Sequence, residues 1–147
     1  MFKLKRPCNN CPFARGRGEF FRLPRLRLLD IVSATGFQCH KTVDYSGPDR
    51  PLPGDHPQQC AGLMALLRAE DKPNQMMQLA ERLNYADFKD LDPEHEAYQT
   101  LAEAFRAHGH RPPARGRDAS SYPRMAGRHS RASDGDVQRR RDQDLPD

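Results

Sequence analysis

Apolar side chains recur with helical spacing in four separate segments of the chain. In the first, Pro24 precedes a run with apolar residues at Leu26, Leu28, Leu29, Ile31 and Val32, as in a helix with proline in its first turn. A second apolar run starts at Cys60 and fades at Glu70–Asp71. Two later segments place apolar residues at i, i+3, i+4 and i+7, namely Met76, Leu79, Ala80, Leu83 and then Tyr98, Leu101, Ala102, Phe105. The pattern predicts about four short helices.

Turn-forming residues mark where these helices begin and end. Gly36 is expected to stop the first helix, and Pro73–Asn74 to break the chain and cap the third. Asp92, followed by Pro93, is the predicted N-cap of the last helix, which would end near His108–Gly109. The predicted fold class is therefore mainly α, with a small α+β fold as the alternative.

Three stretches lack the helical pattern. Residues 37–42 are predicted to form a short strand, and residues 44–57 a long loop, because prolines and glycines interrupt them repeatedly. Residues 111–147 contain four prolines and few apolar side chains, so they cannot bury enough surface to offset the entropy lost on ordering. We therefore expect one domain over residues 1–110 and a disordered tail over residues 111–147.

The overall composition fits this division. The 147 residues have a mean hydropathy of −0.93, which is too polar for an evenly packed globule of that length. No stretch approaches the roughly 18 apolar residues that span a bilayer, and the N-terminus does not resemble a secretory signal. We expect a protein of the bacterial cytoplasm that does not enter a membrane.

Charge is unevenly distributed. Residues 1–36 hold eight Lys or Arg against two acids, whereas residues 37–110 hold seven against twelve. A basic segment of this kind is typical of nucleic-acid contact, although it also occurs as ordinary solvated surface. The candidate contacts with nucleic acid are five arginines: Arg15, Arg17, Arg22, Arg25 and Arg27. The sequence leaves the partner otherwise unknown, and a protein partner is the alternative.

The four cysteines are the strongest chemical signal. They follow the spacing C-x2-C-x27-C-x20-C at Cys8, Cys11, Cys39 and Cys60, each in a predicted turn or at an element boundary. In a reducing compartment, such cysteines bind metal more often than they form disulfides. We predict that all four are ligands of one structural Zn²⁺ that staples a thin core, since such a site can supply about 10–16 kcal/mol of folding energy.

Other interpretations of the cysteines stay open. Four thiolates also suit an iron-sulfur cluster, and Cys11 followed by Pro12 is similar to the Cys-Pro that closes a ferredoxin loop. The remaining possibilities are a thiol-disulfide CxxC site and four unrelated buried thiols. The functional prediction is thus a metal-binding accessory protein, with an iron-sulfur redox or sensor protein as the alternative.

His40 lies directly beside Cys39 in the sequence. It could replace a cysteine as a ligand, but adjacent residues rarely both reach one ion, so we expect it to hydrogen-bond a sulfur of the site instead. His40, Thr42 and the Asp55–His56 pair also suggest a metal-dependent nuclease as a second alternative. Such an enzyme needs a histidine base and an open metal position, and four cysteine ligands would leave none.

Three motifs also carry a resemblance to known proteins. Residues 8–13 read Cys-x-x-Cys-Pro-Phe, residues 37–42 read Phe-x-Cys-His-Lys-Thr, and residues 60–62 read Cys-Ala-Gly. Together they resemble a family of small uncharacterised phage and prophage proteins, and residues 72–83 look like the same group. The resemblance covers roughly residues 6–90. It implies a four-cysteine site and a phage or bacterial setting, and it names no reaction.

Overall fold

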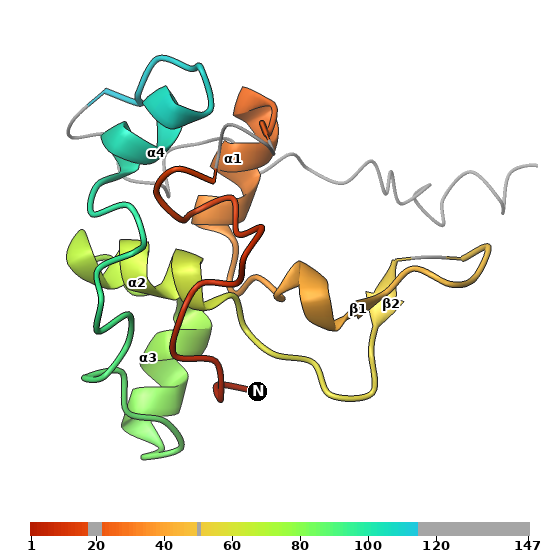
Figure 1. The fold of residues 1–147 in the computed structure, drawn as a ribbon. Coiled ribbons are helices and arrows are strands. Elements are labelled where there is room, and N and C mark those ends of the chain that lie inside the picture. The colour runs from red at the N-terminus through yellow and green to blue at the C-terminus, as the bar shows by residue number, and fades with distance from the viewer. Residues whose placement is uncertain (18–21, 50, 115–147) are drawn as a thin grey trace, which may run out of the picture.

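The computed structural model describes residues 1–17, 22–49 and 51–114. Within them the chain forms four helices, a single 3-10 turn and a two-stranded antiparallel sheet (Figure 1). In chain order the elements are α1 (Arg25–Ser33), the 3-10 turn His40–Thr42, β1 (Val43–Asp44), β2 (Leu52–Pro53), α2 (Ala61–Ala69), α3 (Gln75–Arg82) and α4 (Leu101–Ala107). The prediction of about four short helices is confirmed, and the small sheet makes the fold α+β with few helices.

Helix α2 forms the centre of the core. Its first seven residues, Ala61 to Leu67, are all buried. A helix that is apolar all round must be covered on every side, and here the cover comes from segments distant in sequence. Phe13 from the N-terminal segment, Phe88 after α3 and Phe105 of α4 are fully buried in the same cluster. In Figure 1, α1 and α4 occupy one end of the molecule, and α2 and α3 the other.

Helix α3 is capped as the sequence predicts but packs through different residues. The Asn74 side chain accepts a hydrogen bond from the Met77 amide at 2.9 Å. Met77 and Ala80 are buried, whereas Leu79 and Leu83 are exposed, so the predicted apolar stripe is wrong at two of its four positions. The reason is that Met76 and Met77 are adjacent, and periodicity alone could not decide which of them faces the core.

The last helix is shorter than predicted. It begins at Leu101, and its N-cap is Thr100, whose hydroxyl accepts a hydrogen bond from the Glu103 amide. Residues 92–99 are non-helical because they lie against the N-terminal segment: Tyr98 donates its amide to Phe13, and Ala97 pairs with Ala14. The N-cap predicted at Asp92 is therefore wrong, since tertiary pairing replaces the first helical turns.

The segment between α1 and α2 forms an arm with a narrow base. Antiparallel pairing of β1 with β2 makes a short hairpin that extends away from the helices in Figure 1. The loop predicted over residues 44–57 is therefore wrong at Asp44 and at Leu52–Pro53, which pair as strands because the chain turns back on itself. At the base, Gln38 pairs with Gln59, so the predicted strand over residues 37–42 is reduced to one bridge followed by the 3-10 turn. Gly36 is not a left-handed helix stop. It is needed because a β-carbon there would stand 2.8 Å from Met76 Cγ.

Two further predictions concern the C-terminal tail and the absence of a membrane-spanning segment. Most of the predicted tail, residues 115–147, lies outside the described residues, and residues 111–114 form no helix or strand. Among the described helices, none has the length and apolar character needed to cross a bilayer.

Candidate functional site

Folding brings the four cysteines together from three separate segments. The sulfur atoms of Cys11 and Cys60 lie 3.8 Å apart, and Cys8 Sγ lies 3.2 Å from His40 Nε2. Cys8 is also near enough to Cys11 and Cys39 for these thiols to influence one another's acidity. All four are free thiols; Cys8 is half-buried, whereas the other three are buried. The predicted metal ligands and the histidine predicted to support them therefore form one connected cluster.

A tight turn presents the first two cysteines. The Cys11 amide donates to the Cys8 carbonyl at 3.0 Å, which closes the turn around the two asparagines. The guanidinium of Arg17 donates to that same carbonyl at 2.9 Å and pairs with the Glu96 carboxylate at 2.8 Å. Arg17 thereby ties the cysteine turn to residues 92–99. Arg17 is one of the arginines predicted to contact nucleic acid, and no local sequence signal points to this structural contact.

Backbone pairing at the base of the arm presents the other two cysteines. The Cys39 amide donates to the Gln58 carbonyl at 2.7 Å, and the Cys60 amide donates to the Phe37 carbonyl at 2.8 Å. Cys60 is also the N-cap residue of α2, as its position in the sequence predicts. The long loop between Cys39 and Cys60 is thus closed by hydrogen bonds next to both thiols.

Thr42 reinforces this closure. Its hydroxyl donates to the Cys39 carbonyl at 2.9 Å and accepts from the Gln58 amide at 3.1 Å. Its carbonyl accepts from the Gly54 amide at 3.0 Å, which joins the hairpin to the base. Thr42 is the last residue of the Cys-His-Lys-Thr motif, so the motif pointed to this residue although not to its hydrogen bonds.

Gly62 allows helix α2 to approach the cluster. A β-carbon on residue 62 would collide with Cys11 Sγ and would stand 3.3 Å from Phe13 Cβ. Glycine is unfavourable inside a helix, so its presence here reflects the close approach of the sulfur. The Cys-Ala-Gly motif is explained by these two requirements, a cysteine at the N-cap and no side chain two residues later.

The thiols are crowded enough to change their acidity. Hydrogen bonding to the Cys11 thiol, together with burial, raises the pKa of Cys8 to about 12 from an ordinary 9.0. Contact with the Cys60 thiol raises the pKa of Cys11, and burial raises the pKa of Cys39. Each thiolate formed in this cluster would repel the next one. A divalent cation removes that obstacle, because thiols that coordinate it are deprotonated.

The four thiols are donors that suit a tetrahedral metal ion, but they are not all arranged around one point. Zinc bonds to sulfur are about 2.3 Å long, so two thiolates on one tetrahedral Zn²⁺ lie about 3.8 Å apart. The distance between the sulfur atoms of Cys11 and Cys60 has this value. Within residues 1–17, 22–49 and 51–114, however, no group of three or more Cys, His, Asp or Glu side chains is arranged so that it could hold a metal ion.

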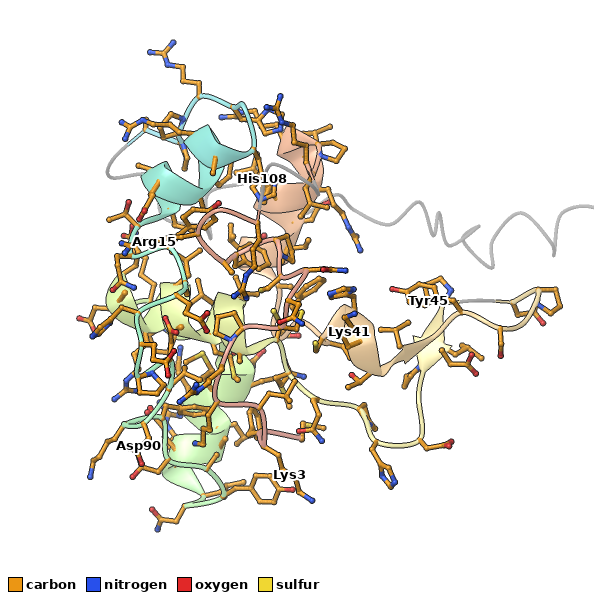
Figure 2. The ribbon with its side chains drawn as sticks, in the orientation of Figure 1. Lys3, Arg15, Lys41, Tyr45, Asp90 and His108 are labelled. Atoms are coloured by element: carbon orange, nitrogen blue, oxygen red, sulfur yellow. The ribbon has the colours of Figure 1, made fainter. Side chains whose placement is uncertain are left out.

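The five arginines predicted to contact nucleic acid have different surroundings. Arg15 pairs with the Glu103 carboxylate at 3.0 Å, and Figure 2 places it near α4. Arg17 pairs with Glu96, as described above. The other three, Arg22, Arg25 and Arg27, are exposed on or just before α1. The predicted set is therefore divided into two paired arginines and three solvent-facing ones.

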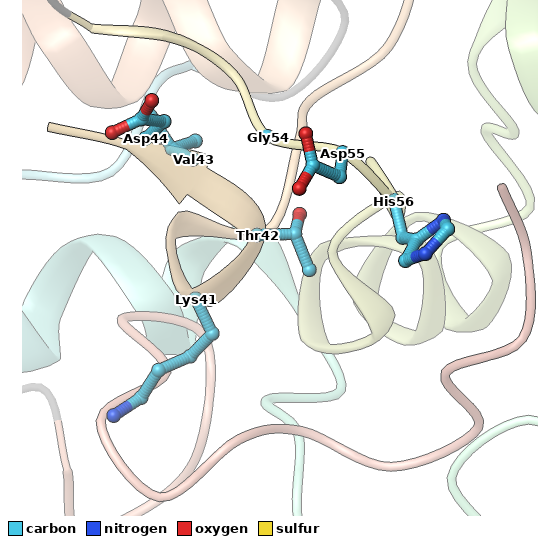
Figure 3. A pocket seen from close by; sticks show the side chains of 7 residues that line it. All are labelled: Lys41, Thr42, Val43, Asp44, Gly54, Asp55 and His56. Atoms are coloured by element: carbon cyan, nitrogen blue, oxygen red, sulfur yellow. The ribbon is translucent and has the colours of Figure 1, made fainter. Parts of the chain in front are cut away.

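A second candidate site lies on the hairpin. A shallow open hollow of about 280 Å³ is lined by Lys41, Thr42, Val43, Asp44, Gly54, Asp55 and His56. Asp55 and His56 are exposed, and in Figure 3 the Lys41 and His56 side chains point away from each other. His40 is directed at Cys8 instead of the Asp55–His56 pair. Of the residues named for the nuclease alternative, Thr42, Asp55 and His56 thus line this hollow, whereas His40 belongs to the cysteine cluster.

Comparisons of the chain with protein-family models, with curated proteins and with solved structures each gave no match. The resemblance to phage and prophage proteins therefore stays a prediction.

Proposed function

We propose that this chain is a small accessory domain stabilised by one structural Zn²⁺ bound to Cys8, Cys11, Cys39 and Cys60. The observation that carries the proposal is the convergence of four thiols from three segments, with the sulfur atoms of Cys11 and Cys60 3.8 Å apart. That pair already has the spacing of two ligands on one ion. Zinc binding has to bring the thiols of Cys8 and Cys39 to the same point, because the described residues hold no group of three or more ligands arranged for a metal.

The same distance favours zinc over a [4Fe–4S] cluster, whereas a [2Fe–2S] cluster, in which two cysteines share each iron, is distinguished from zinc by its colour and sulfide. In a [4Fe–4S] cluster each cysteine binds a different iron, so the thiolate sulfurs are held apart by the cluster's own atoms. Thiolates on a single tetrahedral ion lie in contact with one another. The 3.8 Å contact between Cys11 and Cys60 therefore supports two thiolates on one metal atom and argues against a [4Fe–4S] cluster.

His40 has a defined role in this proposal. Its Nε2 atom is 3.2 Å from Cys8 Sγ, which is the most accessible of the four sulfurs. A hydrogen bond from imidazole to a zinc-bound thiolate lowers the charge on the sulfur and fixes its orientation. His40 therefore supports Cys8, the least buried of the four ligands.

The test is the metal content of the purified full chain. Preparations made with and without oxygen are assayed for zinc, iron and acid-labile sulfide, together with the visible spectrum and the circular dichroism. We expect one zinc per chain, no colour, and loss of helical signal when a chelator removes the metal. Folded protein without metal would overturn the proposal, and a brown protein with sulfide would replace it by the iron-sulfur alternative.

Variants separate ligands from supporting residues. Single serine substitutions at Cys11 and Cys60 should abolish stoichiometric zinc and unfold the domain. Alanine at His40 should retain zinc but bind it about 10–100-fold more weakly. Alanine at His56, an exposed histidine on the same arm, is the matched control and should leave zinc affinity unchanged.

A further inference from the structure

A group of arginines gathers where α1 meets the end of α4, away from the cysteines. One guanidinium nitrogen of Arg22 would stand 3.8 Å from a β-carbon placed on Gly109. The guanidinium carbon of Arg25 lies 6.0 Å from the centre of the Phe105 ring. A hydrogen bond of 2.7 Å between His110 Nε2 and the Leu23 carbonyl joins the two segments. Arg22 and Arg25 of the first segment are therefore held beside the last residues of α4.

The second segment adds two arginines to the same end of the molecule. Arg106 follows Phe105 in the last turn of α4, and Arg111 follows His110. Both are exposed, as are Arg22 and Arg25. Arg27 is left out because two residues along a helix correspond to a rotation of about 200°, which turns it away from Arg25. We name Arg22, Arg25, Arg106 and Arg111 the α1–α4 basic surface.

Among the described residues, no carboxylate forms an ion pair with these four arginines, in contrast to other basic side chains of the fold. Between described residues, carboxylates pair with Arg6, Arg15, Arg17, Arg68 and Lys89, and none of these ion pairs involves the α1–α4 basic surface. Clustered like charges repel each other and cost stability unless something opposes them. A polyanion is the partner that relieves this repulsion at several arginines at once.

The chemistry of the surface favours phosphates on a nucleic acid over a membrane. Arginine presents a planar fork of donors that matches phosphate oxygens, and a chain of phosphates engages several arginines together. A membrane-binding helix needs a broad apolar face directed outward. Helix α1 instead buries Leu28, Leu29 and Ile31 in the core and exposes only Leu26 as a large apolar residue.

We propose that the α1–α4 basic surface binds the phosphate backbone of nucleic acid, without dependence on base sequence. The inference does not rest on the zinc site, because the contacts that position the α1–α4 basic surface involve none of the four cysteines. The surface keeps Arg22 and Arg25 of the set expected from the sequence, leaves out Arg15, Arg17 and Arg27, and adds Arg106 and Arg111.

The test measures binding of the full chain to labelled 20-mer DNA, single- and double-stranded, over a series of salt concentrations. One variant carries alanine at Arg22, Arg25, Arg106 and Arg111. The control carries alanine at Arg6, Arg15, Arg68 and Lys89, which removes the same charge from residues in ion pairs. We expect the first variant to bind more than about tenfold more weakly at low salt, and its slope of log K against log salt to fall by roughly 3 for the duplex.

Each other outcome would overturn the inference. Wild-type protein that does not bind DNA would overturn it. Equal losses of DNA affinity in the two variants would also overturn it, because they would indicate a general effect of charge. Preferential binding to vesicles containing anionic lipid would replace nucleic acid by a membrane surface. A third variant with lysine at the four positions preserves charge and should retain most of the salt slope. Zinc content and circular dichroism of the same samples separate failure of this inference from failure of the zinc proposal.

Discussion

The α-carbon of Gly62 in helix α2 faces the sulfur of Cys11 so closely that no side chain fits between them. Two effects therefore oppose each other in Gly62→Ala. Alanine gains about 1 kcal/mol in helix propensity over glycine, but the added methyl group overlaps the sulfur and the β-carbon of Phe13. We expect the overlap to dominate, lowering the free energy of unfolding by about 1–3 kcal/mol and weakening zinc binding. Urea unfolding and a zinc-chelator competition measure the two effects.

The control for this variant is Gly16→Ala. Gly16 has a φ of 69° and no atom within 4 Å of its added β-carbon. Alanine there should cost about 1 kcal/mol of stability through backbone strain and leave zinc affinity unchanged. A Gly62→Ala protein that is more stable than wild type would show that the sulfur of Cys11 does not occupy this position.

Arg17 and Arg15 offer a matched pair for testing the cysteine turn. Both pair with a glutamate, but only Arg17 also donates to the carbonyl of Cys8. Arg17→Ala should raise the zinc dissociation constant about tenfold, because the turn that orients two ligands loses its support. Arg15→Ala should leave it unchanged. Equal zinc affinities for the two variants would contradict the role given to Arg17.

Asp92 organises the turn that holds residues 92–99 against the N-terminal segment. It is 3% exposed, and its carboxylate accepts hydrogen bonds from the amides of Glu96 and Ala97. Its backbone is left-handed, with a φ of 51°. Asp92→Ala leaves two amides without partners and strains the backbone, so we expect a loss of about 2–4 kcal/mol in thermal or urea unfolding. Asp90→Ala, at an exposed position, should change stability by less than about 0.5 kcal/mol.

His108 makes stability depend on pH. It is 2% exposed and lies between α1 and α4 in Figure 2. Its Nδ1 accepts from the Leu23 amide at 3.0 Å, so its Nε2 carries the proton that it donates to the Pro12 carbonyl at 2.7 Å. The folded state therefore holds the ring neutral. Burial, aided by the charges of His110 and Arg22, lowers the pKa of His108 from its ordinary 6.5.

The sign of the pH effect follows from this shift. Well above pH 6.5 the ring is neutral in both states, and its contribution to stability is complete. As the pH falls below that value, the unfolded chain binds a proton that the folded protein resists, so stability is lost until the folded pKa is passed. His108→Gln should be less stable at pH 7.5 and should lose less stability than wild type between pH 7 and 5. His56→Gln, at an exposed position, should keep the wild-type slope, and an unchanged slope in both variants would contradict the burial of a neutral ring.

Local sequence determined the features that depend on neighbouring residues alone. Asn74 caps α3 and Cys60 precedes α2, because capping and turn chemistry act within a few residues. Proline content alone did not decide residues 44–57, where Leu52–Pro53 pairs with Val43–Asp44 as a strand. The four cysteines could be named as one candidate site because turns and element ends are where ligands are mounted. Their convergence in three dimensions was an expectation that the sequence could not establish.

Only the tertiary structure decided features that depend on contacts between distant segments. Asp92 is a good helix cap by local chemistry, but pairing of Ala97 with Ala14 keeps its segment out of the helix. The arginines look alike in the sequence. Ion pairs with Glu103 and Glu96, which lie 88 and 79 residues away, distinguish Arg15 and Arg17 from the arginines that the described residues leave without an ion pair. In the sequence, Gly62 is only a residue with low helix propensity. The structure explains it, because the sulfur of Cys11 occupies the space of a side chain at this position. The physical reason is the same in each case: propensity acts locally, whereas excluded volume and charge act between whichever groups the fold brings together.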